Sequence, residues 1–170
     1  FFRLLELPHS RLYASEILQL LEFRAITDHF QISDLEIKTF RYWIQESGIR
    51  WGQNAKHRGS FGLTAISENT MEIGLQRMLL GYATGTFAPD QLFQGITPAC
   101  EIRGSETETL GKFIEFITLL LEWLERLRIK RTLMDWSQEL QQLLETFFSG
   151  AFQDQQSRDL QELREHIRQL

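Results

Sequence analysis

A chain of 170 residues with one cysteine, Cys100, is long enough for a sizeable domain, cannot form an internal disulfide and fits a reducing compartment. Its formal net charge of −5 argues against a self-sufficient nucleic-acid-binding protein, which normally carries a basic excess. The low content of turn-forming residues, with only 3 Pro and 11 Gly, disfavours a turn-rich β fold. The most apolar stretch, residues 113–127, is interrupted by Glu115, Glu122 and Glu125, which excludes a membrane span.

Apolar residues that recur every three or four positions predict an all-α, irregular multi-helix fold of about six to eight helices. The first helical segments are expected at residues 15–23 and 24–30. The run Ser33-Asp34-Leu35-Glu36 matches a capping box, so the next helix is expected to begin there and to stop at Gly48. Thr70 is expected to begin the helix that follows.

The second half of the chain continues this helical pattern. Another capping box, Ser105-Glu106-Thr107-Glu108, predicts the start of the longest helix. The basic residues at 126–131 are interpreted as a complement to the dipole of that helix and as solvated surface. Two more helices are expected around residues 136–147 and 160–170, and the apolar stripe of the last one is interpreted as core.

Two segments near 50–68 and 84–104 lack helical periodicity and are expected to be ordered loops. Loops of this length usually have a function or pack against something. The chain begins Phe1-Phe2-Arg3 without a methionine, and its last apolar stripe is cut off in mid-pattern. Residues 1–170 are therefore expected to form a single helical domain that is an internal part of a longer protein.

Several short patterns resemble catalytic motifs, but none of them matches such a motif fully. Gly104 with Gly111-Lys112 has the wrong spacing for a phosphate-binding loop. The triplet Glu36-Ile37-Lys38 has the spacing of metal-dependent nucleases but lies in the first turn of a capped helix, where Glu36 has a structural role. Cys100 is interpreted as an inert thiol, and the histidines are scattered. We therefore expect no catalytic residue, no metal and no cofactor.

The loop near 50–68 is the best candidate for a binding site. It places cationic groups and an aromatic side chain within nine residues, which suits a phosphate backbone with a stacked base. The alternative is that Trp51 anchors the loop on the core and the charges are merely solvated, and both readings remain open. The candidate DNA-binding residues are Arg50, Trp51, Lys56, His57 and Arg58.

Three blocks of sequence, in order, resemble the RecC family, the γ subunits of bacterial exodeoxyribonuclease V. The similarity extends from about residue 2 to about residue 150, and the middle block is the specific one. The blocks are Pro8-His9-Ser10-Arg11 with residues 14–18 and 20–22; residues 41–43, 46–52 and 57–58; and Asn69-Thr70 with residues 74–75 and 77–83.

The chain also departs from this family. Asn69-Thr70 is commonly followed by Trp-Arg-Phe in the family, whereas Met71-Glu72-Ile73 stands here. The positions of Asn54 and Lys56 are often acidic in relatives. The arginine of that family motif has no counterpart in this chain, so no role in DNA contact is inferred from it. No residue is assigned to recognition of the recombination hotspot.

The resemblance implies a helicase-like fold that has lost its ATPase motifs and serves as a scaffold and DNA guide in double-strand-break repair. RecB-like and RecD-like subunits would be its partners, single-stranded or forked DNA its ligand, and the bacterial cytoplasm its location, with no membrane contact. Two other classes of function stay open. One is a protein–protein packing module without DNA contact, and the other is a metal nuclease through Glu36 and Lys38.

Overall fold

A computed structural model describes residues 1–85, 92–149 and 158–169, and within these ranges the chain contains helices and no strands. The predicted all-α class is therefore confirmed. The described residues form nine α-helices and two 3₁₀ helices, more than predicted because two of the α-helices have only five residues. The helices are α1 (Phe2–Glu6), α2 (Ala14–Leu20), α3 (Arg24–His29), α4 (Asp34–Glu46), α5 (Ala55–Gly59), α6 (Met71–Thr84), α7 (Thr107–Leu127), α8 (Leu133–Phe148) and α9 (Arg158–Arg168), with η1 (Leu7–His9) and η2 (Gly104–Glu106).

Helix α4 has the two ends that its sequence predicts. At its start, Ser33 Oγ accepts a hydrogen bond from Glu36 N at 3.3 Å while Glu36 Oε2 accepts one from Ser33 N at 2.7 Å. At its end, Gly48 has a φ of +76°, and Ile49 N donates to Ile44 O at 3.0 Å. This pattern is a Schellman motif, in which glycine reverses the chain without strain.

The predicted capping box at Ser105 is wrong. A 3₁₀ turn, η2, precedes α7 and moves its first residue to Thr107. The carboxylate of Glu106 instead accepts a hydrogen bond from Arg103 N at 3.3 Å, so it caps the 3₁₀ turn. The sequence does not reveal this turn, because the guanidinium of Arg103 cannot accept a hydrogen bond as a capping side chain does, and Gly104 begins the turn with a φ of +35°.

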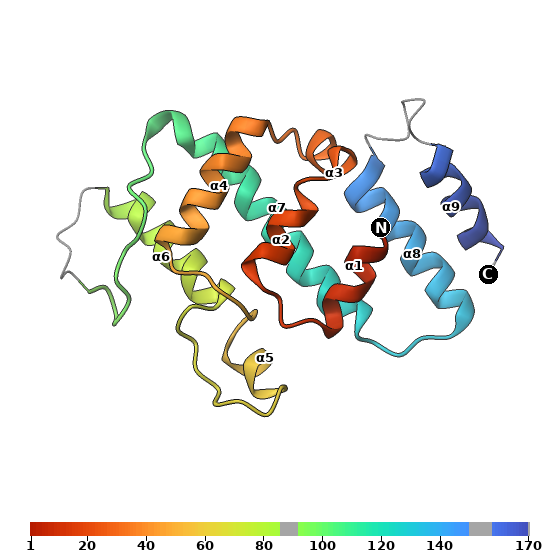
Figure 1. The fold of residues 1–170 in the computed structure, drawn as a ribbon, viewed down its shortest axis with the longest axis horizontal. Coiled ribbons are helices and arrows are strands. Elements are labelled where there is room, and N and C mark those ends of the chain that lie inside the picture. Colours follow the sequence, from red (N-terminus) through yellow and green to blue (C-terminus); the bar gives the residue numbers. More distant parts are fainter. Residues whose placement is uncertain (86–91, 150–157, 170) are drawn as a thin grey trace.

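Helix α7 crosses the middle of the molecule (Figure 1), and its apolar face organises the core. Phe113 packs on Phe40 and Trp43 of α4, with ring centroids 4.8 and 6.3 Å apart. Phe116 and Phe147 both contact Phe30, at 5.3 and 5.9 Å. These aromatic pairs therefore join α3, α4, α7 and α8.

The two ends of the molecule differ in structure. At one end, α8 and α9 lie side by side, and Ile167 is buried with its carbonyl accepting from Ser137 Oγ at 2.6 Å. The stripe of α9 therefore packs as core over Leu160, Leu163 and Ile167, whereas Leu170 lies outside the described residues. At the other end, α6 packs against residues 97–100. Helix α5 lies below the other helices in the view of Figure 1, and its Lys56 and His57 line a pocket together with Pro8, Glu125 and Arg128. None of the described helices is long and apolar enough to cross a membrane.

Candidate nucleic-acid interface

Residues 50–53 run as an extended segment between two other parts of the chain. On one side, Ala14 N donates to Arg50 O at 2.9 Å and Gly52 N to Leu12 O at 3.0 Å. On the other side, Arg50 N donates to Asn69 O at 3.0 Å and Met71 N to Gly52 O at 2.9 Å. The base of the predicted loop is therefore hydrogen-bonded on both sides, as a central strand of a sheet is.

The loop contains a helix that periodicity does not reveal. Asn54 Oδ1 accepts a hydrogen bond from His57 N at 2.9 Å and caps α5. Asparagine is a favoured N-cap residue, so Asn54 was the available signal, but a five-residue helix is too short to show an apolar stripe. The helix turns Lys56 to solvent and His57 and Arg58 inward.

Arg58 braces the loop from inside, with only 7% of its surface exposed. Its guanidinium lies over the Trp51 ring, 4.3 Å from the centroid, and donates to Trp51 O at 3.2 Å and Ile66 O at 3.3 Å. Gly52 makes room for it, because a Cβ there would lie 3.1 Å from Arg58 Cγ. Arg58 thus fixes Trp51, and its Nε is buried without a hydrogen-bond partner.

His57 is equally buried and faces inward. Its Nδ1 accepts a hydrogen bond from Gln53 N at 3.4 Å, and its ring meets Phe61 edge to face at 5.2 Å. Burial lowers the pKa of His57, and the nearby Arg128 lowers it further, whereas Glu125 acts in the opposite direction. The neutral imidazole is therefore favoured.

The structure brings the five candidate residues into one loop but gives them different surroundings. Arg50 and Lys56 are exposed, Trp51 is half-buried, and His57 and Arg58 are buried. Only the first three can meet a ligand without rearrangement of the loop. Neither of the two readings of Trp51 from the sequence describes it fully, because the ring is held by Arg58 and is still partly accessible.

The second basic cluster, residues 126–131, is more ordered than a solvated surface. Arg126 lies over the Trp123 ring at 3.8 Å and donates to Glu139 Oε1 at 2.7 Å. Arg131 contacts the same carboxylate at 3.1 Å and also donates to the carbonyl of Arg126. The expected complement to the helix dipole is present, but these two arginines clamp α7 to α8 and the interpretation as solvated charge is wrong for them.

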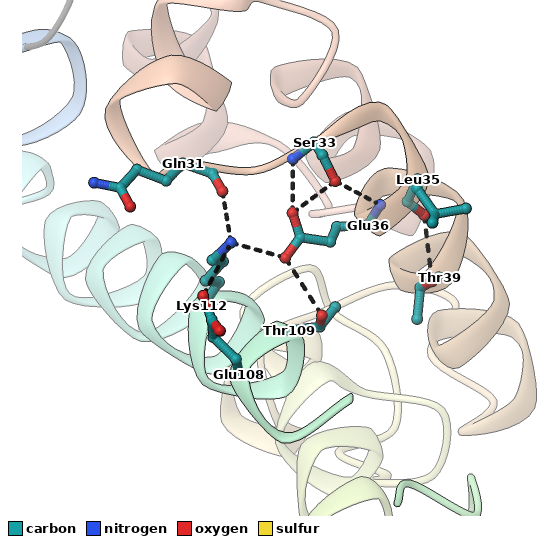
Figure 2. A network of polar contacts seen from close by, with 8 residues as sticks. All are labelled: Gln31, Ser33, Leu35, Glu36, Thr39, Glu108, Thr109 and Lys112. Carbon is teal, nitrogen blue, oxygen red and sulfur yellow. Dashed lines mark hydrogen bonds and ion pairs between the residues drawn. The ribbon is translucent and has the colours of Figure 1, made fainter. Parts of the chain in front are cut away.

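Glu36 and Lys112, which occur in the nuclease-like triplet and in the phosphate-loop-like pattern, meet in one polar network (Figure 2). Lys112 Nζ lies 2.9 Å from Glu36 Oε1 and donates to Gln31 O at 2.7 Å. Thr109 Oγ1 donates to the same Glu36 oxygen at 3.3 Å. The network joins α4 to α7, whereas Lys38 of the nuclease-like triplet is exposed.

Cys100 lies against α4, where its thiol contacts Trp43 O at 3.6 Å. Burial raises the pKa of this thiol to about 12, which agrees with its interpretation as inert. No group of three or more His, Cys, Asp or Glu side chains that could hold a metal ion occurs among the described residues.

Fold and site together define an all-helical protein whose Glu36, Lys112 and Cys100 side chains make structural contacts, and whose loop near 50–68 leaves Arg50, Trp51 and Lys56 at least partly accessible. Over residues 1–170 the chain matches the family described as the fourth domain of the RecBCD enzyme subunit RecC. The chain belongs to this family. The resemblance inferred from the three blocks is thus confirmed.

Curated relatives agree with this assignment. The chain is 34% identical over 150 residues to the RecBCD enzyme subunit RecC of Buchnera aphidicola subsp. Acyrthosiphon pisum, an alignment that covers 88% of this chain and 14% of that protein. It is 32% identical over 148 residues to the subunit of Escherichia coli K12, with 87% and 13% covered. With the subunit of Mycobacterium tuberculosis CDC 1551 it shares 30% over 133 residues, with 78% and 12% covered. The chain therefore spans only about an eighth of the length of these relatives.

Proposed function

We propose that the chain is a noncatalytic region of a RecC-type subunit and acts as scaffold and guide for unwound DNA in double-strand-break repair and homologous recombination. Membership of the RecC fourth-domain family carries this proposal. The relatives are named as subunits of the RecBCD enzyme, so RecB-type and RecD-type subunits are the proposed partners and the bacterial cytoplasm the proposed location.

The internal use of the reactive side chains supports a noncatalytic role. Glu36 and Lys112 form an ion pair at 2.9 Å between two helices, and each has further hydrogen bonds. Cys100 is buried with a thiol pKa raised to about 12. Each of these groups would have to leave a structural contact before it could take part in a reaction.

For DNA contact, Arg50 and Lys56 are the side chains best placed, because both are exposed on the loop that carries the partly accessible indole of Trp51. Cations position a phosphate backbone, and an aromatic ring can stack on an unpaired base. His57 and Arg58 would then act indirectly, by holding α5 and Trp51 in place.

The test measures binding of labelled single-stranded and forked DNA by fluorescence anisotropy at low salt. The double variant Arg50→Ala, Lys56→Ala should bind several-fold more weakly than the parent chain. The matched control is Lys38→Ala, Arg41→Ala, which removes the same charge from exposed positions of α4 and should bind as the parent does. Equal affinity for parent and loop variant would remove these residues from the proposal.

A packing module without DNA contact is the second candidate function. Leu63 and Ile66 in the loop are each 45% exposed, and a groove on α6 is lined by Leu79, Ala83 and Leu92. Such apolar surface fits contact with other subunits. The net charge of −5 agrees with it. Absence of DNA binding at low salt would favour this candidate over the DNA guide.

A further inference from the structure

Tyr13 and Trp51 stand directly opposite each other in an isolated antiparallel bridge. The two flanking hydrogen bonds, Ala14 N to Arg50 O and Gly52 N to Leu12 O, enclose this pair. It is thus a non-hydrogen-bonded pair, in which Cα atoms lie about 4.5 Å apart and the side chains project from the same face. Two aromatic side chains, 38 positions apart in sequence, therefore share one small surface.

Cationic groups hold these aromatic rings. Arg58 covers the Trp51 ring at 4.3 Å from the inside. Arg11 is exposed, donates to the Tyr13 hydroxyl at 3.4 Å and lies 5.9 Å from the centroid of the Phe61 ring. Arg58 thus restricts the motion of the Trp51 ring before any ligand arrives, whereas Arg11 meets Tyr13 only at its hydroxyl.

The surface is accessible and carries an exposed cation. Tyr13 is 43% exposed, and the exposed Arg11 donates to its hydroxyl, whereas Arg50 is next to Trp51 in an extended segment and is directed to the opposite face. The nearest carboxylate in sequence, Glu16, is occupied by hydrogen bonds from Tyr13 N at 2.7 Å and Ser10 Oγ at 3.2 Å. An anionic chain that carries flat, unpaired rings fits these features, because its charge meets Arg11 and its rings meet the aromatic faces.

We infer that Arg11, Tyr13 and Trp51 form a stacking platform for unpaired bases of single-stranded DNA, with Tyr13 as the main stacking residue. The inference rests on the proposed function and adds two residues, Arg11 and Tyr13, from a different part of the sequence. A duplex keeps its bases stacked inside and offers only its backbone, so the platform discriminates single strands from blunt duplexes.

The experiment uses the full-length subunit that carries this chain, in the assembled enzyme, and measures its affinity for labelled oligothymidylate and for a blunt duplex. Tyr13→Leu keeps apolar bulk and removes the aromatic face, and it should weaken single-strand binding about tenfold, in the range measured for loss of one stacked base. Duplex binding should stay unchanged. Tyr13→Phe keeps the aromatic face and loses only the hydroxyl contact with Arg11, so it should retain most of the single-strand affinity.

Tyr82→Leu is the matched control, because Tyr82 on α6 is also 43% exposed, and it should leave both affinities unchanged. Cross-linking of an iodouracil-substituted single strand should label the peptide with Tyr13 in the parent. Parent-like affinity of Tyr13→Leu, or an equal loss for duplex, would overturn the platform. If Arg50→Ala, Lys56→Ala alone weakens binding, the proposed DNA contact stands without the platform. If none of the variants changes affinity, both fail.

Discussion

At the scale of single residues, the Glu36 carboxylate shows how several hydrogen bonds set an ionisation. One of its oxygens accepts from Ser33 N at 2.7 Å and Ser33 Oγ at 2.8 Å, and the other contacts Lys112 Nζ at 2.9 Å. Burial is the largest single effect and raises the pKa, but the bonds from Ser33 and Lys112 together lower it to about 2. The charged carboxylate is therefore stabilised in the folded state.

This depressed pKa predicts a specific dependence of stability on pH. The contribution of Glu36 is present above its unfolded pKa of 4.5 and disappears as the pH falls through the folded pKa of about 2. Glu36→Gln should therefore lower the free energy of unfolding by about 1 to 2 kcal/mol at pH 7 and by much less at pH 2. Urea denaturation of parent and variant at both pH values provides the measurement.

A neighbouring glutamate supplies the control for this prediction. Glu108 also pairs with Lys112, at 3.6 Å, but its side chain is 84% exposed. Exposed pairs of this kind contribute little, so Glu108→Gln should change the free energy of unfolding by less than about 0.5 kcal/mol at either pH. A loss for Glu36→Gln that is the same at pH 7 and pH 2 would contradict the assigned pKa.

At the scale of elements, α6 depends on a close approach to the segment that follows it. Ala99 N donates to Arg77 O at 2.9 Å, and Arg77 Nη1 reaches Ser47 O at 2.7 Å. A Cβ on Gly81 would lie 2.1 Å from Ala99 O and 2.3 Å from Cys100 O. Glycine at position 81 is thus required by packing against backbone, which cannot move aside as a flexible side chain could.

The close contact at Gly81 and the open space at Gly111 predict opposite effects on stability when each glycine is replaced by alanine. Gly81→Ala should lower the free energy of unfolding by about 2 to 3 kcal/mol, because the helix and the 97–100 segment must separate. Gly111→Ala on α7 meets nothing within 4 Å and should raise it by about 0.5 to 1 kcal/mol through better helix propensity. Thermal and chemical unfolding of both variants measures these free energies. If Gly81→Ala unfolds with the same free energy as the parent, helix α6 and the 97–100 segment are not in close contact.

At the scale of the whole molecule, local sequence signals predict the fold better than they predict the geometry of the site. The start of α4 at Ser33 and of α6 at Thr70 could be predicted because both depend on bonds within one helical turn. The register of α7 could not, because Glu106 caps a 3₁₀ turn through the backbone of Arg103, and the sequence carries no capping signal for that turn.

The position of the candidate site in the chain could be predicted from sequence, but the exposure and contacts of its side chains could not. Arg50 to Arg58 form one loop, as expected from their spacing, yet the sequence does not say which cations face solvent. Arg58 is buried because its guanidinium packs on Trp51 beside Gly52 and donates to the carbonyl of Ile66. These contacts bring together residues that precede and follow α5 in the chain. Tyr13 joins Trp51 through a backbone bridge that leaves no pattern in either segment.

The net charge of the chain makes its proposed DNA contact sensitive to a few side chains. With a formal charge of −5, the molecule as a whole repels a phosphate backbone, so attraction must come from local cations. On single strands each phosphate contact contributes about −0.7 to the slope of log affinity against log salt concentration. Loss of the two contacts by Arg50→Ala, Lys56→Ala should therefore make this slope shallower by about 1.4.

Titrations of single-stranded DNA at a series of salt concentrations measure that slope. The double variant Lys38→Ala, Arg41→Ala changes the net charge equally but lies on α4, and its slope should equal that of the parent. If both double variants reduce the slope by the same amount, the effect belongs to overall charge and not to the loop. If neither does, the phosphate contacts lie outside these residues, and the exposed apolar surface around Leu63 and Ile66 then favours the packing module.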